Sequence, residues 1–356
     1  MASAFEHRET DVATSRRILN NQRRSPKVKI LSPLSRSDFA ASTFPGEVST
    51  VPGMRFLVTG AAGFIGSHLA DALRDQGHDV VGLDCFTDYY DVELKEENAR
   101  GLDIRRIDLA RDPLDLAGID GVFHLAGQPG VRSFGDVFET YLDRNVLASQ
   151  RLFEAAARDG VRVVFASSSS IYGEAEVYPT AEDVPPRPVS PYGITKLACE
   201  HLARATARSF GLDVVVLRYF NAYGPRQRPD MAFTRIAMCL AEGRTFDLFG
   251  DGLQSRSFTY VGDVVRGTIA AMEGGSGTYN VGGGEEATMR DTIAVFEELA
   301  GRRLEIRDHP AVPGDQRRTK AETSLIRTEL GWEPMTTLRE GLASQWEWAA
   351  ARVAAR

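Results

Sequence analysis

Arg55-Phe-Leu-Val-Thr-Gly60-Ala-Ala-Gly63-Phe-Ile-Gly66 joins a short apolar run to a glycine loop, and residues 67–76 continue with helical spacing. A second apolar run, Val80-Val-Gly-Leu83, follows within about thirty residues. Glycine lets the backbone turn tightly and approach a phosphate, and the next helix offers its unpaired N–H groups to that phosphate. The stretch therefore predicts a strand–helix–strand unit that binds a dinucleotide through its pyrophosphate.

Asp84 ends the second apolar run, 18 residues after Gly66. A carboxylate at this place accepts hydrogen bonds from the adenosine ribose and repels a 2′-phosphate. No arginine adjoins Asp84 in the sequence, so the pattern favours NAD over NADP; the alternative is an aspartate that only caps a turn. Asp108 and Leu109 are the expected contacts of the adenine.

Outward from this unit, continuous apolar strands alternate with helical spacing. Strands are expected at 121–125, 161–166 and 214–217, and helices at 136–158 and 192–210. This alternation is typical of an α/β protein with a doubly wound parallel sheet, covered on both faces. We expect a Rossmann domain over 54–225 with a returning segment at about 258–273, a smaller substrate-binding lobe mainly over 226–350, and a last helix at about 338–355.

Composition excludes several classes of function. The 356 residues carry 42 Lys and Arg against 49 Asp and Glu, and a net charge of −7 argues against general nucleic-acid binding. No run of 18 apolar residues predicts a membrane span. The three cysteines form no CxxC pair and the histidines no HxxH spacing, so we expect neither disulfides nor a metal site, in a reducing cytoplasm.

Residues 1–53 differ from the rest of the chain, because they are rich in Ser, Thr and Arg and lack apolar periodicity. We expect a disordered extension. A start codon placed upstream of Met54 is the alternative.

Two further stretches carry chemistry: Ala166-Ser-Ser-Ser-Ser-Ile-Tyr-Gly173 after a buried strand, and Tyr192-Gly-Ile-Thr-Lys196. Residues four apart on a helix share a face, so Tyr192 and Lys196 are expected side by side. A tyrosine hydroxyl is a poor base at neutral pH, and a neighbouring ammonium stabilises its phenolate. A serine hydroxyl can hold the substrate oxygen in line.

With these stretches the chain resembles the extended short-chain dehydrogenase/reductases, and among them the NAD-dependent nucleotide-sugar epimerases and dehydratases. The resemblance runs from Met54 to about residue 350, through LVTGAAGFIGSHL, HLAGQPGVR, SSSSIYG, YGITK, RYFNAYGP, GDGLQSRSFTYVGDVV and YNVGGG. It implies bound NAD, a UDP-sugar substrate, and a homodimer that pairs helices 136–158 and 192–210.

The resemblance also implies roles for single residues. Ser168, Tyr192 and Lys196 match the catalytic residues. The implied cofactor contacts are Gly60, Gly63, Phe64, Ile65, Gly66, Asp84, Asp108, Leu109, Leu125, Ala126, Asn145, Ser167, Tyr192, Lys196 and Tyr219. The implied substrate contacts are Ser168, Ser169, Ser170, Asn221, Arg228 and Arg256, of which Asn221 and Arg256 meet the nucleotide diphosphate.

Two residues bear on the reaction. Sugar 4,6-dehydratases place Asp-Glu directly after the catalytic Ser or Thr, and the related decarboxylases keep a Glu at the second position. This chain has Ser169 and Ser170 there. Without those carboxylates, hydride removal and return at one carbon is favoured over elimination, which predicts a 4-epimerase.

Two segments resemble UDP-glucuronate 4-epimerases in particular: 83–95, with Cys85 where they have Asn, and Arg228-Pro-Asp-Met231, whose arginine faces the C6 carboxylate. Pro313-Gly-Asp315 and Thr319 are similar too. The chain departs from them at Ala126-Gly-Gln-Pro-Gly-Val-Arg132 and Ala321-Glu322. The leading prediction is interconversion of UDP-glucuronate and UDP-galacturonate through a 4-keto intermediate.

Three alternatives stay open at this point. The first is a 4-epimerase of UDP-glucose or UDP-N-acetylglucosamine, which would not depend on a C6 carboxylate. The second is a nucleotide-sugar 4,6-dehydratase or decarboxylase, against which Ser169 and Ser170 argue. The third is a cofactor-sensing binding protein without catalysis, which would not need Tyr192 and Lys196.

Overall fold

The glycine-loop stretch folds as predicted, into β1 (Arg55–Thr59), α2 (Phe64–Asp75) and β2 (Asp79–Asp84). These elements belong to a computed structural model that describes residues 53–130, 135–311 and 318–356. Helix α2 begins three residues before the predicted start, because Phe64 already enters the helix and buries its ring in the core. The prediction of disorder concerns residues 1–53, and all of these except Gly53 lie outside the described residues. Arg132 and the stretch 313–315 lie outside them too.

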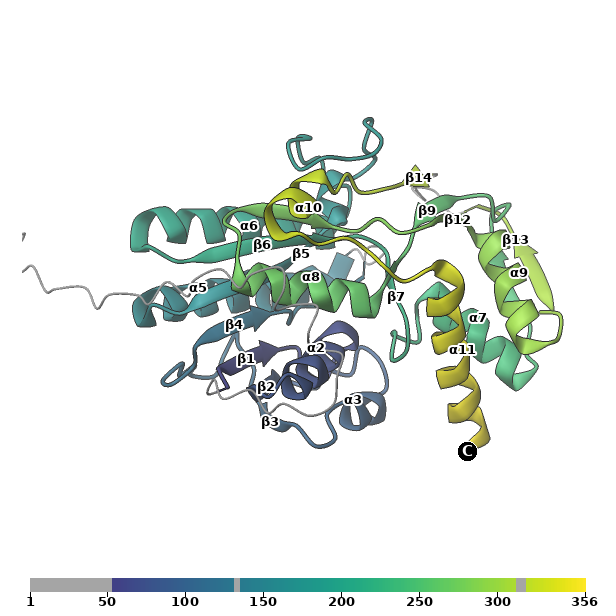
Figure 1. The fold of residues 1–356 in the computed structure, drawn as a ribbon, viewed down its shortest axis with the longest axis horizontal. Helices are drawn as coiled ribbons and strands as arrows, with labels where there is room; N and C mark the ends of the chain where they lie inside the picture. Colours follow the sequence, from purple (N-terminus) through teal and green to yellow (C-terminus); the bar gives the residue numbers. More distant parts are fainter. Residues whose placement is uncertain (1–52, 131–134, 312–317) are drawn as a thin grey trace, which may run out of the picture. The chain divides into compact units, whose positions relative to one another are not determined.

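A seven-stranded sheet forms the centre of the fold, in the order β11-β6-β5-β4-β1-β2-β3, and all of its strand pairs are parallel. Its other strands are β3 (Asp103–Arg106), β4 (Gly121–His124), β5 (Arg162–Ser168), β6 (Val214–Tyr219) and β11 (Thr278–Val281). The predicted doubly wound parallel sheet is thereby confirmed (Figure 1). The strand order reverses between β1 and β4, and ligands bind beside such a point at the carboxyl ends of the strands.

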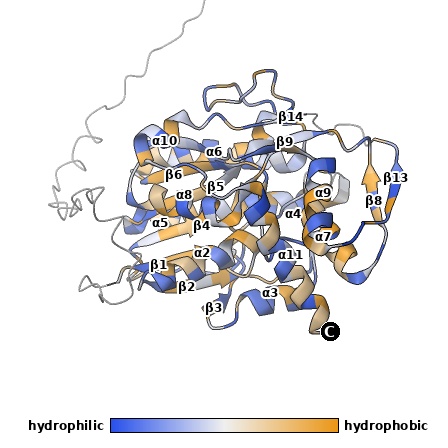
Figure 2. Cartoon of the chain, turned by 45° about the vertical axis from the view of Figure 1, so that its right-hand side comes forward, coloured by the Kyte–Doolittle hydropathy of each residue, from blue (hydrophilic) through white to orange (hydrophobic). Residues whose placement is uncertain are grey.

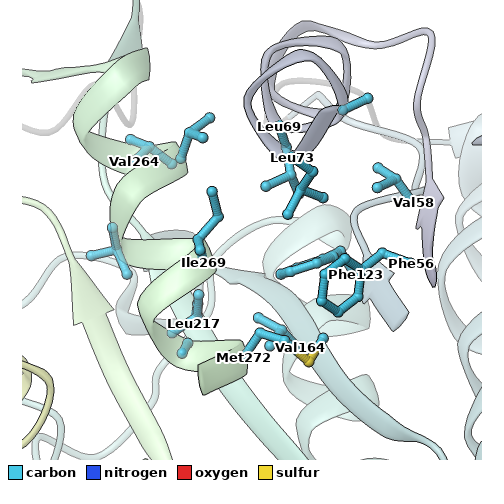
Figure 3. Packing of buried hydrophobic residues seen from close by; sticks show 14 of the residues in the cluster. Phe56, Val58, Leu69, Leu73, Phe123, Val164, Leu217, Val264, Ile269 and Met272 are labelled. Carbon is cyan, nitrogen blue, oxygen red and sulfur yellow. The ribbon is translucent and has the colours of Figure 1, made fainter. Parts of the chain in front are cut away.

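Helices cover both faces of this sheet. On one face α2 and α8 (Val261–Glu273) contribute Leu69, Leu73 and Ile269 to a cluster with strand residues such as Phe123 (Figure 3). On the other face α5 (Ala148–Asp159) and α6 (Pro191–Phe210) pack Phe153 and other apolar side chains on β4 and β5. In Figure 2 the strands β1 and β4 are largely coloured as hydrophobic, as burial on both faces requires.

The stretch expected as one helix over 136–158 is divided. It consists of a 3-10 turn (Gly135–Val137), α4 (Phe138–Tyr141), a π-helical turn η2 (Leu142–Leu147) and α5. The wider π turn carries Asn145, whose buried side chain bonds outside its own helix. Such turns are frequent at functional sites, and helical periodicity alone does not distinguish them from regular helix.

The remaining elements lie between and after the strands of the central sheet. These are α3 (Val92–Asn98), the 3-10 turn η3 (Ser169–Tyr172), β7 (Ala222–Tyr223), α7 (Ala232–Glu242), β8 (Phe246–Phe249), β9 (Ser255–Ser257), β10 (Thr259–Tyr260), β12 (Glu286–Thr288), α9 (Met289–Ala300), β13 (Ile306–His309), β14 (Arg318–Thr319), α10 (Ser324–Leu330) and α11 (Leu338–Ala354). A separate apolar cluster joins α7, α9 and α11 through Phe233, Phe296 and Leu342. The small sheet β12-β9-β14 lies in this part of the chain.

Residues 53–356 form one unit. Segments that follow one another in the sequence are not always neighbours in this unit. Helix α8 packs on the central sheet, where a returning segment at 258–273 was expected. Strand β11, which the sequence analysis did not assign, extends that sheet beside β6. The predicted boundary between a Rossmann domain and a substrate lobe near residue 225 stays a prediction.

Candidate active site

The glycine loop lies at the reversal of strand order, between the ends of β1, β2 and β4. Gly60 has a φ of 70°, and its N–H donates to the carbonyl of Leu83 at 2.7 Å. A Cβ on Gly66 would lie 2.1 Å from the carbonyl oxygen of Gly60, and one on Gly60 would lie 2.9 Å from the nitrogen of Ala126. The close approach of these segments leaves room only for glycine, as a loop that cradles a pyrophosphate requires.

Helix α2 begins directly behind this loop. Gly63 is its N-cap, and no side chain caps its first amides. Unpaired N–H groups and the partial positive charge of a helix N-terminus attract a phosphate. The loop and helix therefore fit the pyrophosphate of a dinucleotide, on the evidence of their own geometry.

A cavity of about 1230 Å³, including the open space at its mouth, extends from this loop along the carboxyl ends of the strands. Its wall includes most of the predicted cofactor and catalytic residues, namely Gly60, Gly63, Phe64, Ile65, Gly66, Asp84, Asp108, Leu109, Leu125, Ala126, Ser167, Tyr192, Lys196 and Tyr219, together with Arg228. The predicted residues Asn145, Ser168, Ser169, Ser170, Asn221 and Arg256 lie outside that wall.

Asp84 is fixed at one end of the cavity. Its Oδ1 accepts from the N–H of Phe86 at 2.8 Å and its Oδ2 from that of Ala62 at 3.3 Å. Burial raises the pKa of this carboxyl, while the two backbone hydrogen bonds and Lys95 act in the opposite direction. Its position at the end of β2 is the one that suits hydrogen bonds to an adenosine ribose.

Asp108 lies at the same end and is held by two arginines. Its Oδ2 accepts from Nη1 of Arg111 at 2.9 Å and of Arg144 at 2.8 Å. Nη1 of Arg144 also lies 3.2 Å from the Sγ of Cys85. The structure thus brings an arginine next to the residue after Asp84, which adjacency in the sequence could not reveal.

The predicted Tyr–Lys pair lies on helix α6, whose first turn is capped by Ser190. The Nζ of Lys196 donates to the carbonyl of Ala166 at 2.8 Å and lies 5.9 Å from the ring centre of Tyr192. Lys196 is buried, whereas Tyr192 is half-buried on the cavity wall. Both predicted residues therefore meet at the cavity, with the ammonium held by the end of β5.

Ser167 and Ser168 end β5 but have different partners. The Oγ of Ser168 lies 3.1 Å from the Oγ of Ser170 and accepts the N–H of Ser170 at the start of η3. The Oγ of Ser167 donates to the buried carboxylate of Glu200 at 2.6 Å. The side chain of Ser167 is thereby turned into the protein, so that a contact with a cofactor would come from the rest of the residue.

Asn145 lies outside the cavity wall and bonds to two of the segments that form it. Its Oδ1 accepts from the N–H of Gln128 at 2.7 Å, and its Nδ2 donates to the Gln128 carbonyl at 3.2 Å and to Oγ1 of Thr195 at 3.0 Å. A Cβ on Gly127 would lie 2.9 Å from Oδ1 of Asn145 and 3.4 Å from Nζ of Lys196. Asn145 thus joins the loop after β4 to the helix that carries the Tyr–Lys pair.

Asn221 and Arg256, predicted to meet the diphosphate, are linked through the sheet β12-β9-β14. The Nδ2 of Asn221 donates to the carbonyl of Ser257 at 3.1 Å and to Oγ1 of Thr319 at 2.9 Å. Thr319 is the register partner of Arg256. The structure therefore brings these two predicted residues into one neighbourhood.

Arg228 lines the cavity on the side of Tyr192. Its Nε and Nη2 donate to the two carboxylate oxygens of Asp230 at 2.9 and 3.0 Å, and its Cζ lies 5.8 Å from the ring centre of Tyr89. Burial lowers the pKa of this guanidinium, but Asp230, Tyr89 and Tyr192 together raise it. An arginine bonded in this way still has N–H groups on Nη1 to offer to an anion.

The sequence analysis missed several residues of the cavity wall. Among them are Lys95, Tyr89 and Tyr90, which follow Asp84 in the stretch 83–95. The Nζ of Lys95 donates to the carbonyl of Thr87 at 2.6 Å and lies 4.7 Å from the ring centre of Tyr90; burial lowers the pKa of this ammonium, while Asp84 raises it. The sequence indicates them only through the resemblance of the whole stretch 83–95 to UDP-glucuronate 4-epimerases. From that stretch, Asp84 alone is predicted as a site residue.

Residues 53–130, 135–311 and 318–356 contain neither a membrane-spanning helix nor a metal-binding cluster. No helix there is long and apolar enough to cross a bilayer. Across the same residues, no three His, Cys, Asp or Glu side chains are grouped so as to hold a metal ion.

The comparisons with known proteins agree with this geometry. The model of the NAD dependent epimerase/dehydratase family matches residues 56–282. The chain is 40% identical to the uncharacterized UDP-glucose epimerase YtcB of Bacillus subtilis (strain 168), over 82% of this chain and 96% of that protein. It is 35% identical to a UDP-glucuronate 4-epimerase of Thermodesulfobacterium geofontis (strain OPF15), over 83% and 95%.

A crystal structure of the UDP-glucuronic acid 4-epimerase of Bacillus cereus, in complex with UDP-glucuronic acid and NAD, is similar as well. The TM-score is 0.80 and the identity 39%, over 84% of this chain and all of that one. The chain belongs to the NAD-dependent epimerase/dehydratase family.

Proposed function

We propose that this enzyme interconverts UDP-glucuronate and UDP-galacturonate by inverting C4. It is an NAD-dependent sugar-nucleotide epimerase, and the proposal concerns its sugar. The observation that carries it is Arg228, a cation on the wall of the same cavity as Tyr192 and Lys196. A guanidinium is suited to a carboxylate, which distinguishes a uronate from a neutral sugar.

The chemistry of the wall supports epimerisation over elimination. Among the lining residues that the structure describes, the carboxylates are Asp84 and Asp108, the two that are predicted from the sequence to contact the adenosine. Elimination of water needs an acid and a base beside the sugar. At the places where dehydratases have them, this chain has Ser169 and Ser170.

In this proposal the protein's own groups move one proton. Tyr192, as the phenolate, takes the proton of the C4 hydroxyl, and Ser168, which adjoins Ser167 of the cavity wall, holds that oxygen in line. Lys196, fixed by the carbonyl of Ala166 at 2.8 Å, stabilises the phenolate. NAD, when bound, supplies the acceptor and later the donor of the C4 hydride. After the 4-keto sugar has rotated in the site, Tyr192 returns the proton to the C4 oxygen, which gives the inverted alcohol.

A uronate substrate can undergo a side reaction, and we assign Arg228 a second role in slowing it. Its 4-keto intermediate is a β-keto acid, which can lose CO₂. Arg228 holds the carboxylate in the plane of the sugar, where that loss is slower. Asp230 occupies Nε and Nη2 of the arginine, so the sugar carboxylate is bound through the remaining N–H groups.

The test compares two substrates. Arg228→Ala is expected to lower kcat/KM for UDP-glucuronate about a hundredfold, the order expected when a buried charge loses its partner, and to change that for UDP-glucose far less. Arg226→Ala is the matched control, because Arg226 lies in the same loop but pairs with Asp71 and is absent from the cavity wall.

Equal losses on both substrates would remove Arg228 from this role. They would favour the second candidate, a 4-epimerase of UDP-glucose. The specific observation in favour of that candidate is the 40% identity to the UDP-glucose epimerase YtcB.

We propose further that the enzyme is a homodimer. In support, Phe138 and Leu142 of the broken helix, and Ile194 of α6, are 41%, 42% and 49% exposed. Large apolar side chains gathered on neighbouring helices are typical of a surface that a partner covers. A cytoplasmic location stays a prediction from the cysteine pattern.

A further inference from the structure

A cluster of polar side chains joins the three strands of the sheet β12-β9-β14 to the segment that contains Tyr178. Glu286 of β12 is its centre: its carboxylate accepts two hydrogen bonds from Arg318, at 2.7 and 3.1 Å, and one from the hydroxyl of Tyr178 at 2.5 Å. The hydroxyl of Ser255 also donates to Glu286. The guanidinium of Arg318 lies 3.8 Å from the ring centre of Tyr178.

The register of the sheet shows which face this cluster occupies. Glu286 is opposite Ser257, and Arg318 is opposite Ser255. Residues directly opposite each other point to the same face, and successive residues of a strand point to opposite faces. The cluster is therefore on one face of β9, and the side chain of Arg256 is on the other.

The face that carries Arg256 also carries Thr319, whose Oγ1 accepts from Asn221 at 2.9 Å. Under the proposed function, Asn221 and Arg256 meet the diphosphate. The Glu286 cluster joins β12 to β14 across β9, and so fixes the strand on which Arg256 stands.

The cluster also reaches the segment that precedes the catalytic helix. Tyr178 lies two residues before Thr180, whose N–H donates to the carbonyl of Lys320 at 2.9 Å and whose carbonyl accepts from the N–H of Glu322 at 2.8 Å. The segment thus runs beside the chain that leaves β14.

We infer that Glu286 is a positioning residue for the nucleotide: it binds no ligand itself, but holds Arg256 in place through β9 from the opposite face. The inference rests on the proposed role of Arg256 at the diphosphate. Three neutral or cationic partners on one carboxylate favour its charged form, and the pKa of Glu286 is lowered to about 2, chiefly by Arg318 and then by Ser255 and Tyr178. Glu286 is therefore ionised, and paired with the guanidinium of Arg318, throughout the pH range in which an enzyme of this kind is assayed.

The test is a double-mutant cycle on the binding of UDP to the full-length enzyme with its NAD, measured by calorimetry. Glu286→Gln is expected to raise the Kd of UDP three- to tenfold, and Arg256→Ala to raise it more. If Glu286 acts through Arg256, the double variant binds UDP like Arg256→Ala alone. Tyr178→Phe removes one of the three partners and should have a smaller effect in the same direction.

A control distinguishes positioning from general loss of stability. Glu298→Gln removes an ion pair with Arg339, at 2.7 Å, from the neighbouring helices α9 and α11, and should leave the Kd of UDP unchanged. The kcat for the UDP-sugar should stay within about twofold in Glu286→Gln while KM rises, which a partly unfolded enzyme would not show.

Three results would overturn the inference, and they have two different meanings. If Glu286→Gln binds UDP like the wild type while Arg256→Ala binds it weakly, or if the two effects multiply in the double variant, Glu286 does not act through Arg256. If Arg256→Ala binds UDP normally, the assignment of Arg256 is wrong, and the inference fails with it.

Discussion

His124, the last residue of β4, contacts side chains next to the candidate site, and we assign it no part in the chemistry. Its ring nitrogens lie 2.8 Å from Oγ1 of Thr59 and 2.9 Å from Oγ of Ser149, and the side chain is fully buried. Burial, and next the charge of Lys196, lower the pKa of this imidazole to about 3. The ring is therefore neutral in the folded enzyme at neutral pH.

This burial makes the stability depend on pH. Between about pH 3 and 6.5 the unfolded chain binds a proton at His124 and the folded chain does not, so the free energy of unfolding falls as the pH falls through this range. One such group contributes a slope of at most ~1.4 kcal/mol per pH unit. His124→Gln keeps a hydrogen-bonding side chain and is expected to flatten the slope by about that amount, in urea unfolding between pH 4 and 6.

The range above pH 7.5 is the internal control, since wild type and variant should there differ by a constant. Parallel slopes below pH 6.5 would contradict the burial of a neutral His124.

At the scale of the element, helix α6 places two predicted catalytic side chains and a buried glutamate on one face. Tyr192, Lys196 and Glu200 follow one another at intervals of four, so they lie above one another along the helix. Lys196 bonds to the carbonyl of Ala166, whereas Glu200 bonds to Ser167 and, bidentately, to the buried Arg218 at 3.0 and 2.8 Å. The same helix therefore fixes the end of β5 at two successive residues.

The sequence predicted only part of this arrangement. The pair Tyr192 and Lys196 follows from spacing alone, because both partners are on one helix. The cofactor contact that the resemblance implies for Ser167 stays a prediction, and nothing local in the sequence reveals that its hydroxyl meets Glu200, 33 residues later. Likewise, periodicity over 136–158 gave one helix, although the tertiary bonds of Asn145 accompany a π turn there.

The start of α2 gives a prediction for cofactor binding. Gly66→Ala adds a Cβ that would lie 2.1 Å from the carbonyl oxygen of Gly60, so the helix and the loop must separate. We expect the purified variant to carry little NAD, measured by its release on denaturation. Gly211→Ala is the control: a Cβ there meets nothing within 4 Å, and any strain from its φ of 74° is confined to the far end of α6. Full NAD content in the Gly66→Ala variant would contradict the claim that the glycine loop and the start of α2 bind the pyrophosphate.

At the scale of the molecule, distant segments complete the site. The glycine loop, the β5 end and helix α6 come from the first part of the chain, whereas Arg228 of the cavity wall comes from the second. The fold class was predictable because continuous apolar strands alternate with helices. Strand β11 was missed because its four residues pair with β6, some sixty positions earlier, and carry no comparable local pattern.

The proposed dimer is also tested at this scale. Phe138→Asp places a charge on the exposed apolar surface of the broken helix and is expected to yield monomers, measured by light scattering after size-exclusion chromatography. Phe210→Asp is the control, because Phe210 is 69% exposed but lies at the opposite end of α6 from Ile194. A wild-type enzyme that is monomeric at micromolar concentration would rule out a stable homodimer.

The most direct test of the central claim is incubation of the purified enzyme with UDP-glucuronate and no added cofactor, with the products identified by NMR. The proposed function predicts a mixture of UDP-glucuronate and UDP-galacturonate. A UDP-pentose would instead reveal a decarboxylase, and no reaction, with UDP-glucose converted in a parallel sample, would contradict the assignment of Arg228 to a uronate.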